Sequence, residues 1–209
     1  MGLFYGANKM ALVDFKLFTD SGLTNVFSGT FQLVHQSDLS DGNQDLQLWF
    51  GSNGATTLKT TVNPDVDQIT LTPVEILPAW QASTAYALGD TIEPTVQNNF
   101  RYECSTAGTS GASEPTFPTS GIGSVVSDGT AVWKLVAATH EPTEIKLAAT
   151  AAGLPAATAG AALSLGTSIA SGVANAKEIN IRITNTVTDV SSNAGHPELA
   201  VDINDVSEV

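Results

Sequence analysis

The feature that most constrains this fold is a period-two alternation of apolar and polar residues that recurs along the chain. It is clearest in residues 178–185, where Ile179, Ile181 and Ile183 alternate with polar or charged neighbours. Successive side chains of a β-strand point to opposite faces, so this spacing places the three isoleucines on one face. The same alternation recurs in residues 143–148. Repeated short runs of this kind predict an all-β chain.

Further short strands are predicted between clusters of Gly, Asn, Asp and Ser. They are residues 13–17, Phe27 with 30–34, 46–51, 68–73 and 163–166. Residues 199–203 fit either a last strand or an extended arm. The alanine-rich stretch after residue 148 is interrupted by Gly153, Pro155 and Gly160, so it does not predict an amphipathic helix. The pattern predicts an antiparallel β-sandwich, either immunoglobulin-like or jelly-roll-like.

Residues 78–137 differ in composition from both flanks. This window holds six of the 14 aromatic residues, four prolines and long loops of Gly, Ser and Thr. Such a composition predicts a small loop-rich β module with an aromatic core. We expect a discontinuous sandwich body, residues 1–77 plus 141–209, with residues 78–140 inserted in one loop, because surface loops tolerate insertions. The alternative is three consecutive small units, of which neither flank holds enough strands for a closed sandwich.

The charge balance argues against two classes of partner. The 209 residues include 8 Lys and Arg against 21 Asp and Glu, which gives a formal net charge of −13. Binding to nucleic acid or to an anionic membrane surface requires clustered basic side chains, so neither partner is expected. The first residues lack the pattern of an export signal. No stretch has the roughly 20 strongly apolar residues of a membrane span.

Patterns that carry catalysis or bind metals are sparse. The single cysteine, Cys104, is expected to be a buried thiol, because one cysteine supports neither a disulfide framework nor a cysteine zinc site. Four residues begin like a calcium-binding loop: Asp38, Asp41, Asn43 and Asp45. The Gly and the final Glu of that loop pattern are missing, which favours a solvated polar turn. The sequence predicts no enzyme, no metal and no cofactor.

Both ends of the chain carry apolar residues that a free tail in water would not favour. We expect the following residues to contact neighbouring subunits: Leu3, Phe4, Tyr5, Met10, Leu199, Val201 and Ile203. A frayed terminus is the alternative for residues 1–11. The acidic residues of the last segment are expected to be solvated rather than to bind a metal. They are Asp202, Asp205 and Glu208.

The central window resembles the small aromatic modules related to the chitin- and cellulose-binding domains of bacterial glycosidases. The residues that carry the resemblance are Trp80, 83–90, 100–104, 107–111, 114–115, 128–130 and Trp133. The version with a Gly-Thr-Ser-Gly loop looks like the one embedded in virion proteins of tailed bacteriophages. Carbohydrate modules stack sugars on exposed rings, and the candidates here are Trp80, Tyr86, Tyr102 and Trp133. The alternative is that these rings form the core of the module.

The flanking body is similar to a family of phage virion proteins in several short stretches. They are residues 18–23, 27–29, 48–52, 67–71 and 161–166. This resemblance implies a structural protein that decorates the outer surface of a phage capsid in the virion. Its expected partners are the major capsid protein and copies of itself, a trimer on local three-fold axes being one arrangement. An acidic exterior also favours the outside of a DNA-filled shell over its lumen.

Two alternative functions follow from the sugar-binding interpretation of the central window. The first is a carbohydrate-binding adhesion component of a phage tail or fibre, whose partner would be a glycan of the host surface. The second is a secreted polysaccharide-binding module, which the missing export signal disfavours.

Overall fold

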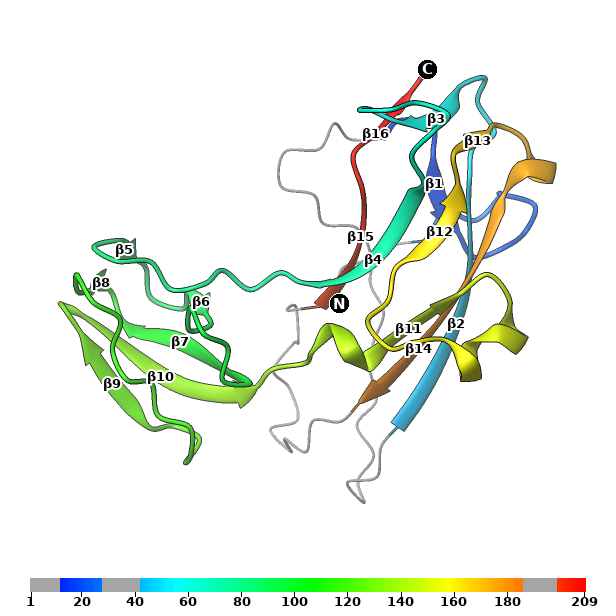
Figure 1. Ribbon diagram of the computed structural model, residues 1–209. Coiled ribbons are helices and arrows are strands. Elements are labelled where there is room, and N and C mark those ends of the chain that lie inside the picture. The colour runs from blue at the N-terminus through cyan, green and yellow to red at the C-terminus, as the bar shows by residue number, and fades with distance from the viewer. Residues whose placement is uncertain (1–11, 28–41, 186–198) are drawn as a thin grey trace. The chain divides into compact units, whose positions relative to one another are not determined.

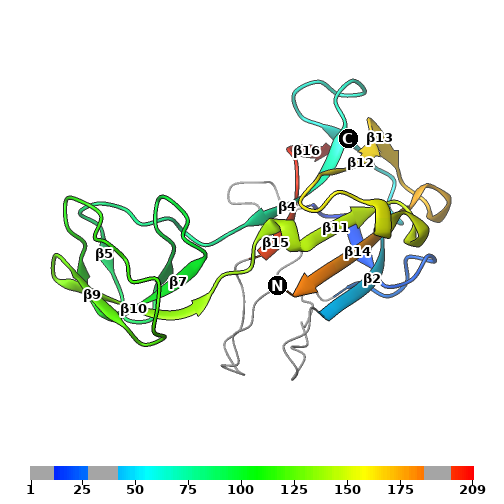
Figure 2. The same cartoon turned by 60° about the horizontal axis from the view of Figure 1, so that its bottom comes forward.

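The computed structural model describes residues 12–27, 42–185 and 199–209. These residues form an all-β fold, in which all pairings between named strands are antiparallel and the helices are short 3-10 turns. The chain divides into two compact units. The body comprises the described residues up to Glu75 together with 141–185 and 199–209, and the inserted unit comprises residues 76–140. Figures 1 and 2 show the strands of both units.

One layer of the body is a four-stranded sheet. Its strands run in the order β1 (Lys16–Phe18), β2 (Gly42–Gly51), β14 (Lys177–Asn185) and β11 (Ile145–Ala148). The two long central strands pair along their whole length, from Lys177 opposite Phe50 to Asn185 opposite Gly42. The alternation that the sequence shows in residues 178–185 therefore lies at the centre of this sheet, and its three isoleucines are buried.

Two three-stranded sheets supply the opposing side of the body. One has the order β12 (Leu163–Gly166), β4 (Ile69–Glu75) and β15 (Leu199–Ile203). The other has the order β13 (Ser168–Ala170), β3 (Thr57–Thr60) and β16 (Val206–Glu208). A single apolar cluster joins residues of all three sheets of the body, which gives the sandwich-like packing predicted from the sequence. Its fully buried members include Leu48, Leu58, Leu71, Ile169 and Ile181.

Several strand boundaries differ from those predicted. Residues 143–144 lie in the 3-10 helix η1 (Pro142–Glu144), because proline at the first helical position favours a turn there. The predicted strand 30–34 lies outside the described residues. Pro73 lies within β4, which a proline is expected to interrupt. In the described sheet, however, β12 pairs only with the first part of β4, and Pro73 pairs with β15 alone.

Residues 151–156 and 173–175 also form 3-10 helices, η2 (Ala151–Ala156) and η3 (Val173–Asn175). The hydroxyl of Thr150 caps η2 by accepting a hydrogen bond from the Gly153 N–H at 3.2 Å. The chain then reaches β12 at Leu163 without a longer helix, in agreement with the sequence, which did not predict an amphipathic helix in this stretch. These turns therefore connect strands of the body without adding a helical layer.

The inserted unit contains two small sheets. The larger has the order β6 (Thr91–Ile92), β7 (Phe100–Thr106), β10 (Ala131–Ala138) and β9 (Val125–Asp128). The smaller pairs β5 (Ala85–Tyr86) with β8 (Gly108–Thr109). This unit has a separate apolar cluster that shares no residue with that of the body. The structural division falls at 75/76 and 140/141, close to the sequence-based boundaries at 77/78 and 140/141.

Candidate functional site

The aromatic rings proposed for sugar stacking lie in the inserted unit, and three of the four are buried. Trp133 and Tyr102 are 0% exposed and Trp80 is 6% exposed. All three belong to the apolar cluster of this unit, together with Ile92 and Leu135. A ring buried to this extent offers no face to a sugar. The structure thus corrects the stacking assignment for these three rings in favour of the alternative, in which they form the core.

Tyr86 is the fourth ring and is half-buried. Its ring packs edge-on against Trp133 with 4.7 Å between centroids and an interplanar angle of 78°. Its hydroxyl accepts a hydrogen bond from the backbone N–H of Gln81 at 2.9 Å. Both the ring and the hydroxyl of Tyr86 therefore support the fold of the inserted unit.

A buried carboxylate, Asp128, joins two tryptophans of this core. Its Oδ2 accepts hydrogen bonds from the indole Nε1–H groups of Trp80 at 2.7 Å and Trp133 at 2.9 Å. Its Oδ1 accepts from the backbone N–H of Gly111 at 2.7 Å. Asp128 is only 3% exposed. Buried polar groups require partners, and this one side chain satisfies three donors that would otherwise be unpaired.

The turn after Asp128 explains the Asp-Gly-Thr sequence at this point. Gly129 adopts a positive φ of 62°, and a Cβ there would lie 2.3 Å from the carbonyl oxygen of Thr109. Glycine therefore allows strand β8, which contains Thr109, to approach the β9–β10 turn closely. The Thr130 hydroxyl accepts from the Thr109 N–H at 2.8 Å, which ties these two segments together.

The Tyr102 hydroxyl is also fully engaged. It donates to the carbonyl oxygen of Pro118 at 2.7 Å and accepts from the Asn98 side-chain amide at 2.8 Å. Burial raises the pKa of the Tyr102 hydroxyl, and the hydrogen bond from Asn98 opposes that rise only in part. Tyr102 is thus a neutral core residue, a role that leaves no polar atom of its side chain for a ligand.

Cys104 is buried, as the sequence predicted. Burial raises the pKa of the Cys104 thiol, and its Sγ lies 3.1 Å from the carbonyl oxygen of Thr106, to which it donates. Because the thiolate is the nucleophilic form, a thiol held protonated in a dry core is unreactive. Cys104 therefore acts as a small apolar residue of the inserted unit.

A shallow hollow of about 250 Å³ lies on the inserted unit. It is lined by Pro94, Val96, Asn98, Glu114, Pro115 and Phe117. The carboxylate of Glu114 accepts hydrogen bonds from both the backbone N–H, at 2.8 Å, and the hydroxyl of Thr95. The side-chain amide of Asn98 is likewise engaged, by Tyr102 and by the Phe100 N–H. The polar groups that could orient a ligand in this hollow are thus already used within the unit.

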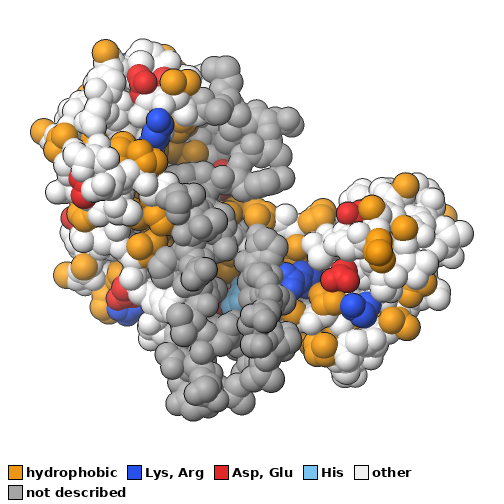
Figure 3. All heavy atoms as spheres, turned by 180° about the vertical axis from the view of Figure 1, so that it is seen from behind, with side chains coloured by type: hydrophobic (Ala, Val, Ile, Leu, Met, Phe, Trp, Pro, Cys, Tyr) orange, Lys and Arg blue, Asp and Glu red, His pale blue; other side chains and the backbone are white. Residues whose placement is uncertain are grey.

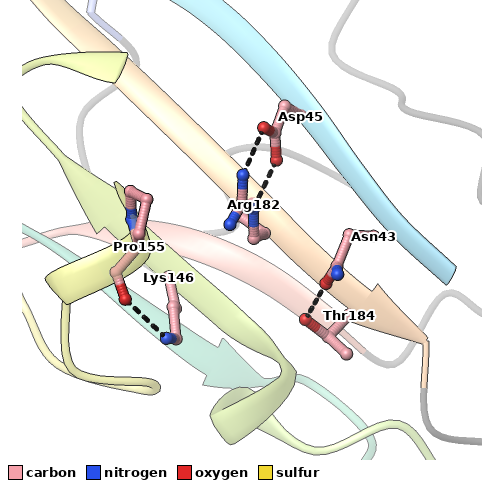
Figure 4. A network of polar contacts seen from close by, with 6 residues as sticks. All are labelled: Asn43, Asp45, Lys146, Pro155, Arg182 and Thr184. Carbon is pink, nitrogen blue, oxygen red and sulfur yellow. Dashed lines mark hydrogen bonds and ion pairs between the residues drawn. The ribbon is translucent and has the colours of Figure 1, made fainter. Parts of the chain in front are cut away.

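A row of polar side chains lies across β2 and β14 of the body (Figure 4). Arg182 donates from Nε and Nη2 to the two carboxylate oxygens of Asp45, both at 2.7 Å. The Thr184 hydroxyl donates to the Asn43 side-chain oxygen at 2.6 Å. Asn43 and Asp45 thus lie in a strand, and the expected polar turn at these residues is corrected. Asp38 and Asp41 lie outside the described residues.

The same row continues towards the start of β14. Glu178 accepts from the side-chain amides of Gln47 at 2.7 Å and Asn180 at 2.9 Å. These two hydrogen bonds lower the pKa of Glu178. The hydrogen bond from Arg182 lowers the pKa of Asp45 in the same way. Together with Asn43 and Thr184, these side chains of β2 and β14 form one row of polar groups. Its paired groups give the body a regular face of mixed charge.

The C-terminal contact residues lie in the core of the body. Leu199 and Val201 are 1% exposed and Ile203 is 6% exposed, all in β15 beside β4. They fill the sandwich of their own chain, so they do not present a surface to neighbouring subunits, and that assignment is corrected. Leu3, Phe4, Tyr5 and Met10 lie outside the described residues.

Glu208 has a role that the sequence did not indicate. Its carboxylate accepts hydrogen bonds from the backbone N–H groups of Val13, Asp14 and Phe15 at 3.1, 2.9 and 2.8 Å. Three consecutive N–H groups converge on one carboxylate, and the last strand is thereby tied to the segment before β1. The interpretation of Glu208 as part of a solvated tail is therefore corrected. Its partners lie almost the whole chain away, so no local pattern marks them.

Two further findings concern the described residues alone. Among them, no group of three or more His, Cys, Asp or Glu side chains has a geometry that could hold a metal ion. No helix in the described part of the chain is long and apolar enough to cross a membrane.

The chain was compared with models of protein families, with curated proteins and with solved structures. None of the three comparisons found a match.

Proposed function

We propose that this chain is a non-enzymatic structural protein of a tailed-phage particle, which decorates the outer surface of the capsid through protein–protein contacts. Its partners would be the major capsid protein and neighbouring copies of itself. The proposal starts from the resemblance of the sequence to phage virion proteins. It is supported by an architecture in which two β units each have their own core.

The observation that carries the proposal is the use of the aromatic rings in the inserted unit. Trp80, Tyr102 and Trp133 close the core of this unit, and Asp128 satisfies both indoles. Rings placed in this way are already packed and hydrogen-bonded within the unit, which suits a spacer or contact pad better than a sugar site. The carbohydrate-binding alternative needs exposed rings, and for this reason we do not propose it.

The surface of the body also suits contacts with protein. Figure 3 shows one face of the molecule, where basic side chains are few and separate among apolar and uncharged atoms. Non-obligate protein interfaces are about as apolar as the rest of a protein surface, so a surface of this composition is compatible with protein contacts. Contacts repeated over a shell would stabilise it, because opening the shell would first have to break them.

The composition of purified particles tests this proposal. Particles of the phage that encodes the chain are purified, and this protein is quantified against the major capsid protein by gel densitometry and mass spectrometry. A decoration protein is expected in a fixed, high ratio to the major capsid protein. A low copy number would instead indicate a tail component, and absence from the particle would overturn the proposal.

The N-terminal residues allow a second test of the same proposal. If Leu3, Phe4, Tyr5 and Met10 contact neighbouring subunits, deleting residues 1–10 should lower the occupancy of the protein on particles. The described body should stay folded, because β1 begins only at Lys16. Unchanged occupancy would remove this segment from the interface without affecting the rest of the proposal.

A further inference from the structure

The loop between β3 and β4, residues 61–68, is exposed along its whole length. It carries two valines whose side chains lie largely in water, Val62 at 75% and Val66 at 72% exposure. Pro64 lies between them. Single exposed apolar residues are common on protein surfaces, but here two valines and a proline are all exposed within residues 62–66 of one loop. We name residues 61–68 the valine loop.

The backbone of the valine loop is held in place by hydrogen bonds. The carbonyl oxygen of Asn63 accepts from the N–H groups of Val66 and Asp67, both at 3.1 Å, and from the Thr60 hydroxyl at 2.9 Å. The Asn63 side-chain amide donates to Asp67 at 2.8 Å. A loop fixed in this way loses little conformational entropy when it binds a partner, so its exposed valines are already positioned for contact.

The charges around these valines are mainly negative. Asp65 and Asp67 belong to the loop, and the exposed Asp205 is adjacent, since its carbonyl oxygen accepts from the Thr61 N–H at 3.1 Å. The one basic residue placed here by an ion pair is Lys59, whose Nζ lies 2.6 Å from Asp65. The two exposed valines thus have mainly acidic neighbours, so a complementary partner surface has an apolar depression with a basic rim.

We propose that the valine loop inserts Val62 and Val66 into an apolar depression, rimmed by Lys or Arg, on a different protein of the particle. This inference rests on the proposed function and names the surface through which the body binds. A second copy of the chain is the less suitable partner, because the chain has only 8 basic residues against 21 acidic ones. Three of the basic residues are already ion-paired within the chain, namely Lys59, Lys134 and Arg182.

Co-sedimentation with particles tests the inference. Particles made by a phage that lacks the gene are mixed with the purified full-length chain, and the bound protein is measured at increasing concentration. The double variant V62S/V66S should weaken the apparent affinity by about tenfold or more, since it removes the buried apolar area of two side chains. V173S is the matched control, because Val173 is an exposed valine of the same body at 49% and should bind like the wild type.

The expected result includes two supporting observations. The thermal unfolding of V62S/V66S should match that of the wild type, because both side chains are exposed in the free protein. Raising the salt concentration should weaken the binding of the wild type, because it screens the contact between the acidic loop and a basic rim.

Each contrary outcome has a distinct meaning. If the wild type does not sediment with particles, the proposed function fails and this inference fails with it. If the wild type binds and V62S/V66S binds equally well, only the inference fails. If the wild type self-associates in analytical ultracentrifugation and V62S/V66S does not, the valine loop binds a second copy, and the assignment to a different protein is overturned.

Discussion

The body and the inserted unit are both antiparallel, but they exclude water from their cores with different side chains. The body core is built mainly from leucine, isoleucine and valine, spread over three sheets. The core of the inserted unit is built largely from aromatic rings, with Trp80, Tyr102 and Trp133 at its centre. Rings fill space efficiently, but tryptophan and tyrosine bring polar atoms that need partners when buried.

Because of this difference, the buried polar atoms of the rings in the inserted unit depend on very few residues for their hydrogen bonds. Asp128 serves both indole groups, and the Pro118 carbonyl serves the Tyr102 hydroxyl. An aliphatic core has no such requirement, so the stability of the body is distributed over many similar contacts. The comparison indicates that a single polar substitution should unfold the inserted unit, while the body should respond mainly to changes in volume.

The largest expected effect comes from D128A. It leaves the indole N–H groups of Trp80 and Trp133 and the backbone N–H of Gly111 without their acceptor. At about 1–3 kcal/mol for each of these three unpaired groups, the free energy of unfolding of the inserted unit should fall by about 3–9 kcal/mol. Hydrogen exchange measured by mass spectrometry should show lost protection in peptides from residues 76–140 and retained protection in the body. E103A changes a half-buried carboxylate of the same unit that makes one ion pair with Lys134, and it is the control; equal effects of the two variants would contradict the role of Asp128.

The reverse pattern is expected from L48A in the body. Leu48 is 0% exposed at the centre of the sandwich, and its truncation should lower the free energy of unfolding of the body by about 2–5 kcal/mol. Protection against hydrogen exchange should now fall in the body peptides and persist in residues 76–140. A parallel loss in both units would show that they unfold together and would break the comparison drawn above.

A smaller effect is expected from E208Q, because it removes the charge that receives three backbone N–H groups. Hydrogen bonds to charged groups contribute about 1.5–3 kcal/mol, and glutamine keeps one acceptor oxygen, so we expect a loss of about 1–2 kcal/mol. The amides of residues 13–15 should exchange faster than in the wild type. D205N, which changes a nearby exposed carboxylate, should leave them unchanged; a similar rise in both variants would argue against the contact.

The smallest effect is expected from the exposed pair of Asp45 and Arg182. Surface ion pairs contribute about 0.2–1 kcal/mol, which a double-mutant cycle with D45N and R182Q should resolve in urea unfolding. The hydrogen bond from Arg182 holds the pKa of Asp45 below its ordinary value. The stabilisation is therefore present above that value and is lost as the pH falls through the lowered pKa. A coupling energy that stays the same at pH 7 and in strong acid would contradict this assignment.

The sequence predicted the strands whose alternation is long enough to be read locally. Residues 178–185 are the best case, because three buried isoleucines define one face without knowledge of the partner strand. The short strands β3 and β13 were missed. Each has one large apolar residue, Leu58 or Ile169, and this is too few to show a period. Their assignment depends on pairing with each other and with β16, which a local pattern does not contain.

The polar groups that organise the site were less predictable for a related reason. Trp80 lies 48 residues before Asp128, and Arg182 lies 137 residues after Asp45. The sequence indicated an aromatic core in the central window but could not say which carboxylate would meet the indoles. It predicted the burial of Cys104 correctly, because that argument needed only the residue itself and its count.

The position of the inserted unit has a consequence for the order in which the chain folds. Strand β4 ends just before this unit, whereas its partners β12 and β15 follow long after it. During synthesis, all strands of the inserted unit emerge before β4 can find either partner, so this unit is free to fold first. Its folding then shortens the flexible connection across which the body must close. The contact from Glu208 to residues 13–15 can form only after the chain has been synthesised as far as residue 208.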